Sequence, residues 1–147
     1  MQYSEAKQGR IFILRLEDGE IIHENVENFA KEKNIKAASV IILGGADKGS
    51  KLVVGPQDGT AKQIEPMEYV MENVHEIAGV GTIFPDENEI PLLHMHIAGG
   101  RKDSAVAGCI RRGVKTWLIT EIIITEIVET EACRRNDADS GFALLSP

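Results

Sequence analysis

The chain has 147 residues, of which 43% are hydrophobic and 27% charged, and its formal net charge is -7. This is the composition of an ordinary soluble protein, so we expect residues 1–147 to form a single domain that folds without disulfides or a structural metal. The net negative charge argues against a protein that binds nucleic acid through its overall electrostatic field, because that affinity comes from Lys and Arg displacing counterions. The composition does not exclude a local basic patch on the surface.

The cysteine content and the apolar segments bear on the cellular compartment. Two cysteines, Cys109 and Cys133, are too few for a secreted disulfide framework and fit a reducing compartment. The first ten residues lack the apolar stretch of a signal peptide, and the longest apolar run, residues 117–128, is too short and too interrupted by Thr and Glu to span a bilayer. We therefore expect a cytoplasmic protein with no membrane partner.

The first third of the chain predicts a β-α-β unit. Residues 10–16 are β-branched and apolar enough for a strand. Residues 20–33 carry apolar side chains at helical spacing, with acidic residues early and basic residues late, and Asn34 is expected to end this helix. Residues 36–43 form a continuous apolar run, which predicts a strand covered on both faces, and Gly44–Gly45 after it is interpreted as a tight turn.

The middle of the chain predicts strands and a hairpin. Residues 62–83 are interpreted as one long bent strand or as two, broken near Gly79 and Gly81. Residues 91–98 and 104–110 are expected to pair as a hairpin.

The longest extended segment, residues 114–129, is apolar on both of its alternating faces. A strand of this kind needs cover on both sides, because either set of side chains is costly to leave in water. One face is therefore a candidate contact with another subunit.

The most informative pattern for chemistry is Leu92-Leu-His-Met-His-Ile97. On a strand, successive side chains point to opposite faces, so His94 and His96 share one face while Met95 and its apolar neighbours point to the other. Two imidazoles then lie side by side.

A third ligand type is expected opposite this pair. With the hairpin turn centred near residues 101–102, Cys109 falls opposite His94 or His96, so that two nitrogens and one sulfur converge on a tetrahedral ion with a fourth position open. The alternative is that both histidines are hydrogen-bonded sheet residues and the cysteine is a small buried hydrophobe. His75 is a candidate fourth ligand, but a lone histidine in a strand is more often structural.

Two further side chains are pocket candidates. Glu76 is a candidate base beside a zinc-bound water, whose pKa the metal lowers toward neutrality. Arg15 stands in an apolar strand, where an unpaired charge is expensive, so it either marks a cationic pocket or pairs with an acid. The short basic groups at residues 111–115 and 134–135 lack interleaved aromatic residues, so we interpret them as a solvated face.

Five segments stand out by their order and spacing: residues 12–20 (FILRLEDGE), 37–45 (AASVIILGG), 91–96 (PLLHMH), 106–109 (VAGC) and 135–142 (RNDADSGF). Together they resemble the plants-and-prokaryotes-conserved domain, which follows the AT-hooks of plant nuclear proteins and occurs alone in bacteria and archaea. The resemblance covers nearly the whole chain.

The resemblance implies an α+β fold: an antiparallel β-sheet, arranged as a sandwich or partly open barrel, with one main helix packed on it and three copies in a homotrimer. Prokaryotic members that resemble this chain typically join the His-x-His pair to a third histidine in a Gly-Gly-His-Leu segment, and zinc is the implied ion. Here the matching segment is Ala107-Gly-Cys-Ile110, so Cys109 stands in place of that histidine. A thiolate can replace an imidazole at a zinc site, and the alternative is that the metal has been lost.

Relatives are also described as candidate DNA-binding proteins, by similarity to the plant proteins. This chain has no Arg-Gly-Arg-Pro core of an AT-hook, so direct DNA binding is expected to be weak or absent. We therefore expect a zinc-binding homotrimeric module, with zinc held by His94, His96 and Cys109. The alternatives are a regulatory, DNA-associated interaction protein without metal chemistry, acting through an unknown protein partner or small ligand, and a zinc-dependent hydrolase of unknown substrate.

Overall fold

The computed structural model describes residues 1–61, 64–138 and 140–147. Within them, eight strands form one antiparallel sheet in the order β1-β8-β2-β5-β6-β7-β3-β4, and two more form a small hairpin. The elements in chain order are β1 (Lys7–Glu17), α1 (Ile22–Glu32), β2 (Ala37–Ala46), β3 (Lys51–Pro56), β4 (Pro66–Val70), β5 (His75–Pro85), β6 (Pro91–Arg101), β7 (Ser104–Cys109), the 3-10 turn η1 (Ile110–Arg112), β8 (Thr116–Val128), β9 (Cys133–Asn136) and β10 (Ala143–Ser146).

The helix α1 forms where the apolar spacing predicts it, although it is shorter at both ends than the predicted residues 20–33. Its buried stripe of Ile22, Val26 and Ala30 recurs every four residues, which places all three side chains on one face against the sheet. The chain leaves the helix through Asn34, whose φ of 54° is left-handed, a conformation that Asn tolerates better than most residues. The prediction that Asn34 ends the helix is thus confirmed.

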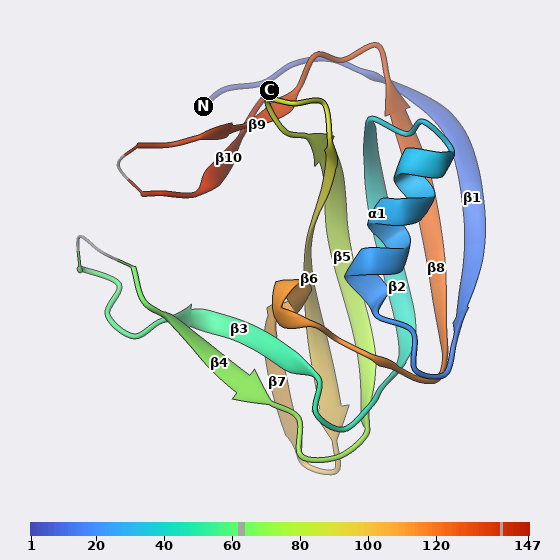
Figure 1. The fold of residues 1–147 in the computed structure, drawn as a ribbon, viewed down its shortest axis with the longest axis vertical. Coiled ribbons are helices and arrows are strands. Elements are labelled where there is room, and N and C mark those ends of the chain that lie inside the picture. Colours follow the sequence, from blue (N-terminus) through green and yellow to red (C-terminus); the bar gives the residue numbers. More distant parts are fainter. Residues whose placement is uncertain (62–63, 139) are drawn as a thin grey trace.

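The face of the sheet that α1 covers, here called the inner face, carries the hydrophobic core. Met95 and Ile97 of β6 and Ile122 and Ile124 of β8 are all at most 1% exposed. They pack with the helix stripe into one cluster. The fold is therefore α+β with an antiparallel sheet and one main helix, as predicted, and the sheet is open rather than a closed barrel, with β1 and β4 as its edges (Figure 1).

The predicted β-α-β start is present, with β8 inserted between β1 and β2. The interpretation of Gly44–Gly45 as a tight turn is wrong, because β2 runs through both glycines to Ala46. The register against β8 shifts between them, and a Cβ on Gly44 would lie 2.5 Å from the carbonyl oxygen of Ile119. These glycines form an irregularity at which two backbones approach closely.

The predicted break near Gly79 and Gly81 is also wrong. Both glycines lie inside β5, and the chain turns earlier, between β4 and β5. A Cβ on Gly79 would come within 2.5 Å of Ile97, so glycine here admits a side chain of the neighbouring strand and does not interrupt β5. The first two residues of the predicted 62–83 segment lie outside the described residues.

The opposite side of the sheet, here called the outer face, carries an exposed apolar row. Ile13, Ile123, Ile41 and Val80 are direct partners across β1, β8, β2 and β5, and their exposed fractions are 85%, 45%, 53% and 67%. The prediction that the longest strand is apolar on both faces is confirmed, and within the described chain only the inner set is covered.

Two hairpins, β3–β4 and β9–β10, project from the same side of the molecule and are here called the two arms (Figure 1). The β9 strand contacts β5, which fixes one arm above the outer face. No helix among the described residues has both the length and the apolar character needed to cross a membrane.

Candidate metal centre

Two imidazoles lie side by side on the outer face of β6. Their spacing follows from the alternation of the strand, which buries Leu93 and Met95 and leaves both histidines open. The Nε2 atoms of His94 and His96 are 3.1 Å apart, and the two rings meet edge to face. The predicted pairing of these histidines on one face is therefore present.

The hairpin brings a thiol to the same place. The turn between β6 and β7 lies at Lys102–Asp103, and the resulting register sets Cys109 directly opposite His96. The ligand atoms of His94, His96 and Cys109 all lie within 4.8 Å of one another. Of the two positions that the sequence left open, the structure selects His96 as the cross-strand partner.

The donor set has the dimensions of a zinc site. Zn–N bonds of about 2.0–2.1 Å at a tetrahedral angle place two nitrogens about 3.3 Å apart, close to the 3.1 Å between the two imidazoles. A thiolate and two imidazoles are ligands of the kind that zinc prefers, and three protein ligands leave one position open. The residues present therefore fit zinc.

The surroundings favour neutral imidazole at His94. Desolvation by the surrounding protein, with the positive charges of Arg134, His96 and Arg111, lowers the pKa of His94 below its ordinary value of 6.5. A metal needs the deprotonated nitrogen, so this shift removes a competing proton at neutral pH.

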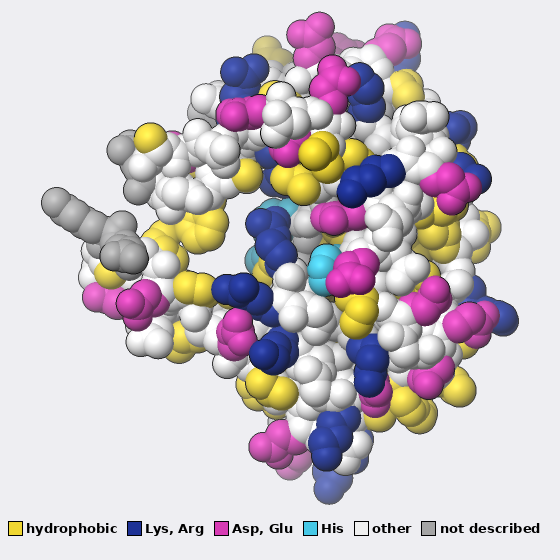
Figure 2. Space-filling model, viewed as in Figure 1, with side chains coloured by type: hydrophobic (Ala, Val, Ile, Leu, Met, Phe, Trp, Pro, Cys, Tyr) yellow, Lys and Arg dark blue, Asp and Glu magenta, His cyan; other side chains and the backbone are white. Residues whose placement is uncertain are grey.

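The three ligand-type side chains line a cavity of about 640 Å³ between the arms. Figure 2 shows a hollow there, with basic and histidine side chains on its inner wall and hydrophobic side chains on the arms. The lining residues are Val53, Gly55, Pro66, His94, His96, Cys109, Arg111, Arg112, Arg134, Phe142, Ala143 and Leu144. The part of the chain that the structure describes contributes no carboxylate to this wall.

Arg134 is the important side chain that sequence reasoning missed. The sequence predicts it to be part of a solvated basic face, yet it is 5% exposed and donates a hydrogen bond from Nη2 to Thr82 Oγ1 at 3.0 Å. Its neighbour Arg135 is exposed, as expected. No sequence signal separates the two arginines, because the burial of Arg134 arises where β9 packs on β5, a strand about fifty residues away.

The other sequence candidates lie elsewhere. Arg15 is on β1 and pairs with Glu17 at 2.5 Å, which is the ordinary alternative for it. Glu76 is four residues from Val80, the partner of His96, and thus about 13 Å along β5 from the site. His75 is buried and its Nδ1 contacts the carbonyl oxygen of Asn73 at 2.8 Å, a structural role. The structure does not bring Arg15 or Glu76 to the cavity.

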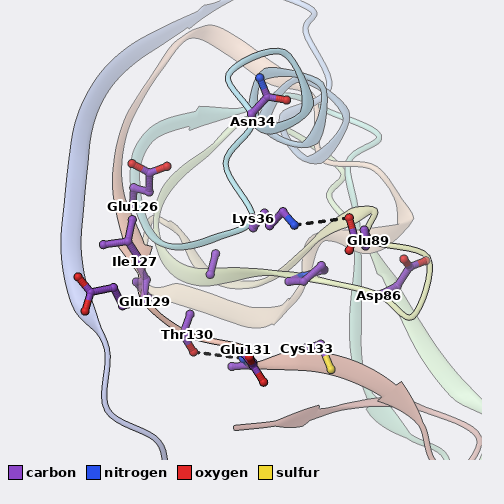
Figure 3. A pocket seen from close by; sticks show the side chains of 14 residues that line it. Asn34, Lys36, Asp86, Glu89, Glu126, Ile127, Glu129, Thr130, Glu131 and Cys133 are labelled. Carbon is purple, nitrogen blue, oxygen red and sulfur yellow. Dashed lines mark hydrogen bonds and ion pairs between the residues drawn. The ribbon is translucent and has the colours of Figure 1, made fainter.

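A second cavity, of about 610 Å³, lies below the helix C-terminus and is lined by acidic side chains (Figure 3). Three of its carboxylates have basic partners: Glu89 pairs with Lys36 at 3.5 Å, Glu126 with Arg10 at 2.6 Å and Glu129 with Lys7 at 2.8 Å. Cys133 lines its wall. This cavity matches the first in size, but the cluster of metal-ligand-type groups found among the described residues lines the first cavity.

The chain resembles a known protein family and several solved structures. The model of the Plants and Prokaryotes Conserved (PCC) domain matches residues 3–128, whereas a search of the curated proteins gives no significant match. A metal-containing protein from Archaeoglobus fulgidus is 23% identical, with a TM-score of 0.84 and complete coverage of both chains. A plant- and prokaryote-conserved protein from Pyrococcus horikoshii is 21% identical, with a TM-score of 0.85 over 100% of this chain and 98% of the other.

A third similar structure, from Bacteroides thetaiotaomicron, is named as a candidate DNA-binding protein. It is 22% identical, has a TM-score of 0.76 and covers 96% of each chain. At these identities the likeness establishes a shared fold.

Proposed function

We propose, from the premise that the chain belongs to the Plants and Prokaryotes Conserved domain family, that it is a single-domain, cytoplasmic, homotrimeric module that binds one zinc ion per chain through His94, His96 and Cys109. The observation that carries the proposal is the convergence of these ligand atoms within 4.8 Å on the wall of a cavity. The Archaeoglobus fulgidus neighbour, named as metal-containing, supports it.

Zinc bound here supplies a Lewis-acidic centre with one open coordination position. Cys109 supports zinc over harder cations, because thiolate ligands select soft and borderline metals rather than Mg²⁺ or Ca²⁺. The cavity gives small molecules access to that position, so the site suits ligand binding better than a purely structural role.

The homotrimer is supported by the outer apolar row of Ile13, Ile123, Ile41 and Val80. A contiguous exposed apolar surface on a soluble domain typically marks an interaction surface. Such a row lies on the same face as the metal site, since Val80 pairs with His96 in the next strand. We therefore assign it to contacts between copies of the chain.

Elemental analysis of untagged protein tests the metal assignment. Wild type is expected to hold about one zinc per chain, and His96→Ala and Cys109→Ser are expected to lose it. Cys133→Ser is the matched control, because this cysteine lines the other cavity and should leave the zinc content unchanged. Wild-type protein without zinc above background, even after incubation with the ion, would contradict the proposal.

A DNA-associated role has less support. Relatives are named as candidate DNA-binding proteins, but the chain has a net charge of -7. Three of its arginines, Arg111, Arg112 and Arg134, line a cavity between the two arms. We expect no shift of duplex DNA even at low salt, where counterion release favours binding most.

A further inference from the structure

The cavity holds positive charge that the described chain does not neutralise. Arg112 pairs with Glu68 at 3.0 Å. Arg134 and Arg111 have no carboxylate within ion-pair distance among the described residues. In a chain with a net charge of -7, this is a local reversal of sign.

The missing counter-charge matters more for Arg134 than for Arg111, because Arg134 is buried and Arg111 is exposed. Its side chain is 5% exposed, its only described hydrogen bond goes to the neutral hydroxyl of Thr82, and its buried Nε has no partner among the described residues. A buried guanidinium is expensive without an anion, because desolvation is compensated only by a counter-charge and by satisfied N–H groups. The side chain is thus arranged to receive an anion from outside the chain.

The two arms contribute apolar side chains to the cavity wall. Phe142 and Leu144, on the β9–β10 arm, are 47% and 49% exposed, and Val53 and Pro66 face the same space from the β3–β4 arm. A volume of about 640 Å³ is in the range of small-molecule sites. The wall therefore combines an anion-binding end with an apolar lining, which suits an organic acid better than a simple inorganic ion.

We propose that this cavity binds a small organic carboxylate, whose anionic end is held by Arg134 and Arg111 and whose apolar body lies against Phe142 and Leu144. The planar guanidinium matches a carboxylate through paired N–H donors. This inference deepens the proposed function and rests on it for one point: the carboxylate lies beside the open position of the His94, His96 and Cys109 site.

Calorimetric titration of the zinc-loaded full chain with three probes tests the ligand class. Benzoate has both the anion and the apolar body, benzamide is its uncharged analogue, and inorganic phosphate is an anion without the body. Benzoate is expected to bind at least about tenfold more tightly than either of the others, the difference that one charge-assisted hydrogen bond makes. Equal binding of benzamide or of phosphate would overturn the proposal, as would no saturable binding of benzoate.

Variants locate the binding. Arg134→Met and Arg111→Met are each expected to weaken benzoate binding about tenfold or more, while Arg135→Met, an exposed neighbour outside the cavity, leaves it unchanged. Arg111 is exposed, so its variant tests the proposal even if Arg134→Met unfolds. Wild-type affinity for benzoate in a folded Arg111→Met protein would overturn the proposal.

The zinc content of each protein separates this inference from the proposed function. Arginine variants that retain zinc but lose benzoate support both. Bound zinc without benzoate binding overturns the carboxylate proposal alone. Arginine-dependent benzoate binding in a protein that takes up no zinc overturns the metal assignment and retains the anion site.

Discussion

The two faces of the sheet differ in how far the rest of the chain covers their side chains. On the inner face, apolar side chains such as Met95 and Ile124 are covered by α1. On the outer face, an apolar row lies open, and the cavity holds two histidines together with Arg111 and Arg134, which have no acidic partner among the described residues. The inner face is covered within one chain and stabilises the fold, whereas the outer face leaves apolar and ligand-type side chains uncovered. We therefore place the proposed function on the outer face.

The largest effect is expected at the metal ligands. His94→Ala removes one of three proposed zinc ligands from the outer face and should weaken zinc binding by more than about 100-fold, beyond the loss typical of residues that only orient a ligand. The measurement is competition with a chromophoric zinc chelator. Unchanged affinity in the folded variant would remove His94 from the site.

The inner-face counterpart is Met95, which lies between the two histidines and points the other way. Met95→Ala should lower the free energy of unfolding by about 2–4 kcal/mol, because it leaves a cavity in a packed core. Zinc affinity should stay near the wild-type value in the folded protein. Chemical denaturation and zinc titration of the same sample check both statements, and a stability loss of less than about 0.5 kcal/mol would contradict the packing argument.

The outer apolar row gives a third prediction. Ile41→Glu places a charge at the centre of the row, where association would desolvate it, and should weaken self-association by at least about tenfold. Analytical ultracentrifugation over a range of concentrations measures this. Lys48→Glu, on an exposed turn outside the row, serves as the control for added negative charge. A wild-type monomer at high concentration would contradict the homotrimer.

The smallest effect concerns a charge at the margin of the inner face. Hydrogen bonds from Arg10 hold the pKa of Glu126 below its ordinary value of 4.5. A carboxylate with a lowered native pKa contributes stability that is complete above its unfolded pKa and is lost as the pH falls through the native one. Wild type should therefore lose this contribution below about pH 4.5.

Glu126→Gln should cost about 1–2 kcal/mol at neutral pH and flatten the acid limb of the stability curve. Thermal unfolding from pH 7 to pH 3 measures both. A variant whose acid limb is as steep as that of wild type would show that another carboxylate governs it.

The parts of this structure that sequence reasoning predicts are those governed by local periodicity. The spacing of Ile22 and Val26 predicts α1, and the alternation around Met95 predicts that both histidines face one way. The hairpin turn then limits the partner of Cys109 to two positions. These features depend on residues close in sequence.

Other features depend on contacts between distant segments, and there sequence reasoning failed. Gly79 and Gly81 suggest a break, but the neighbouring β6 strand makes glycine necessary inside β5. Arg134 and Arg135 are indistinguishable in sequence, and only the packing of β9 on β5 buries one and exposes the other. The sequence indicates Glu76 as a candidate base, but the strand register places it away from the site.

X-ray absorption at the zinc edge of the reconstituted protein tests the central claim most directly. We expect one sulfur at about 2.3 Å and three lighter atoms at about 2.0–2.1 Å, two of them with imidazole scattering, and we expect the sulfur to disappear in Cys109→Ser. A spectrum with only oxygen and nitrogen neighbours in the wild-type protein would contradict a site built from His94, His96 and Cys109.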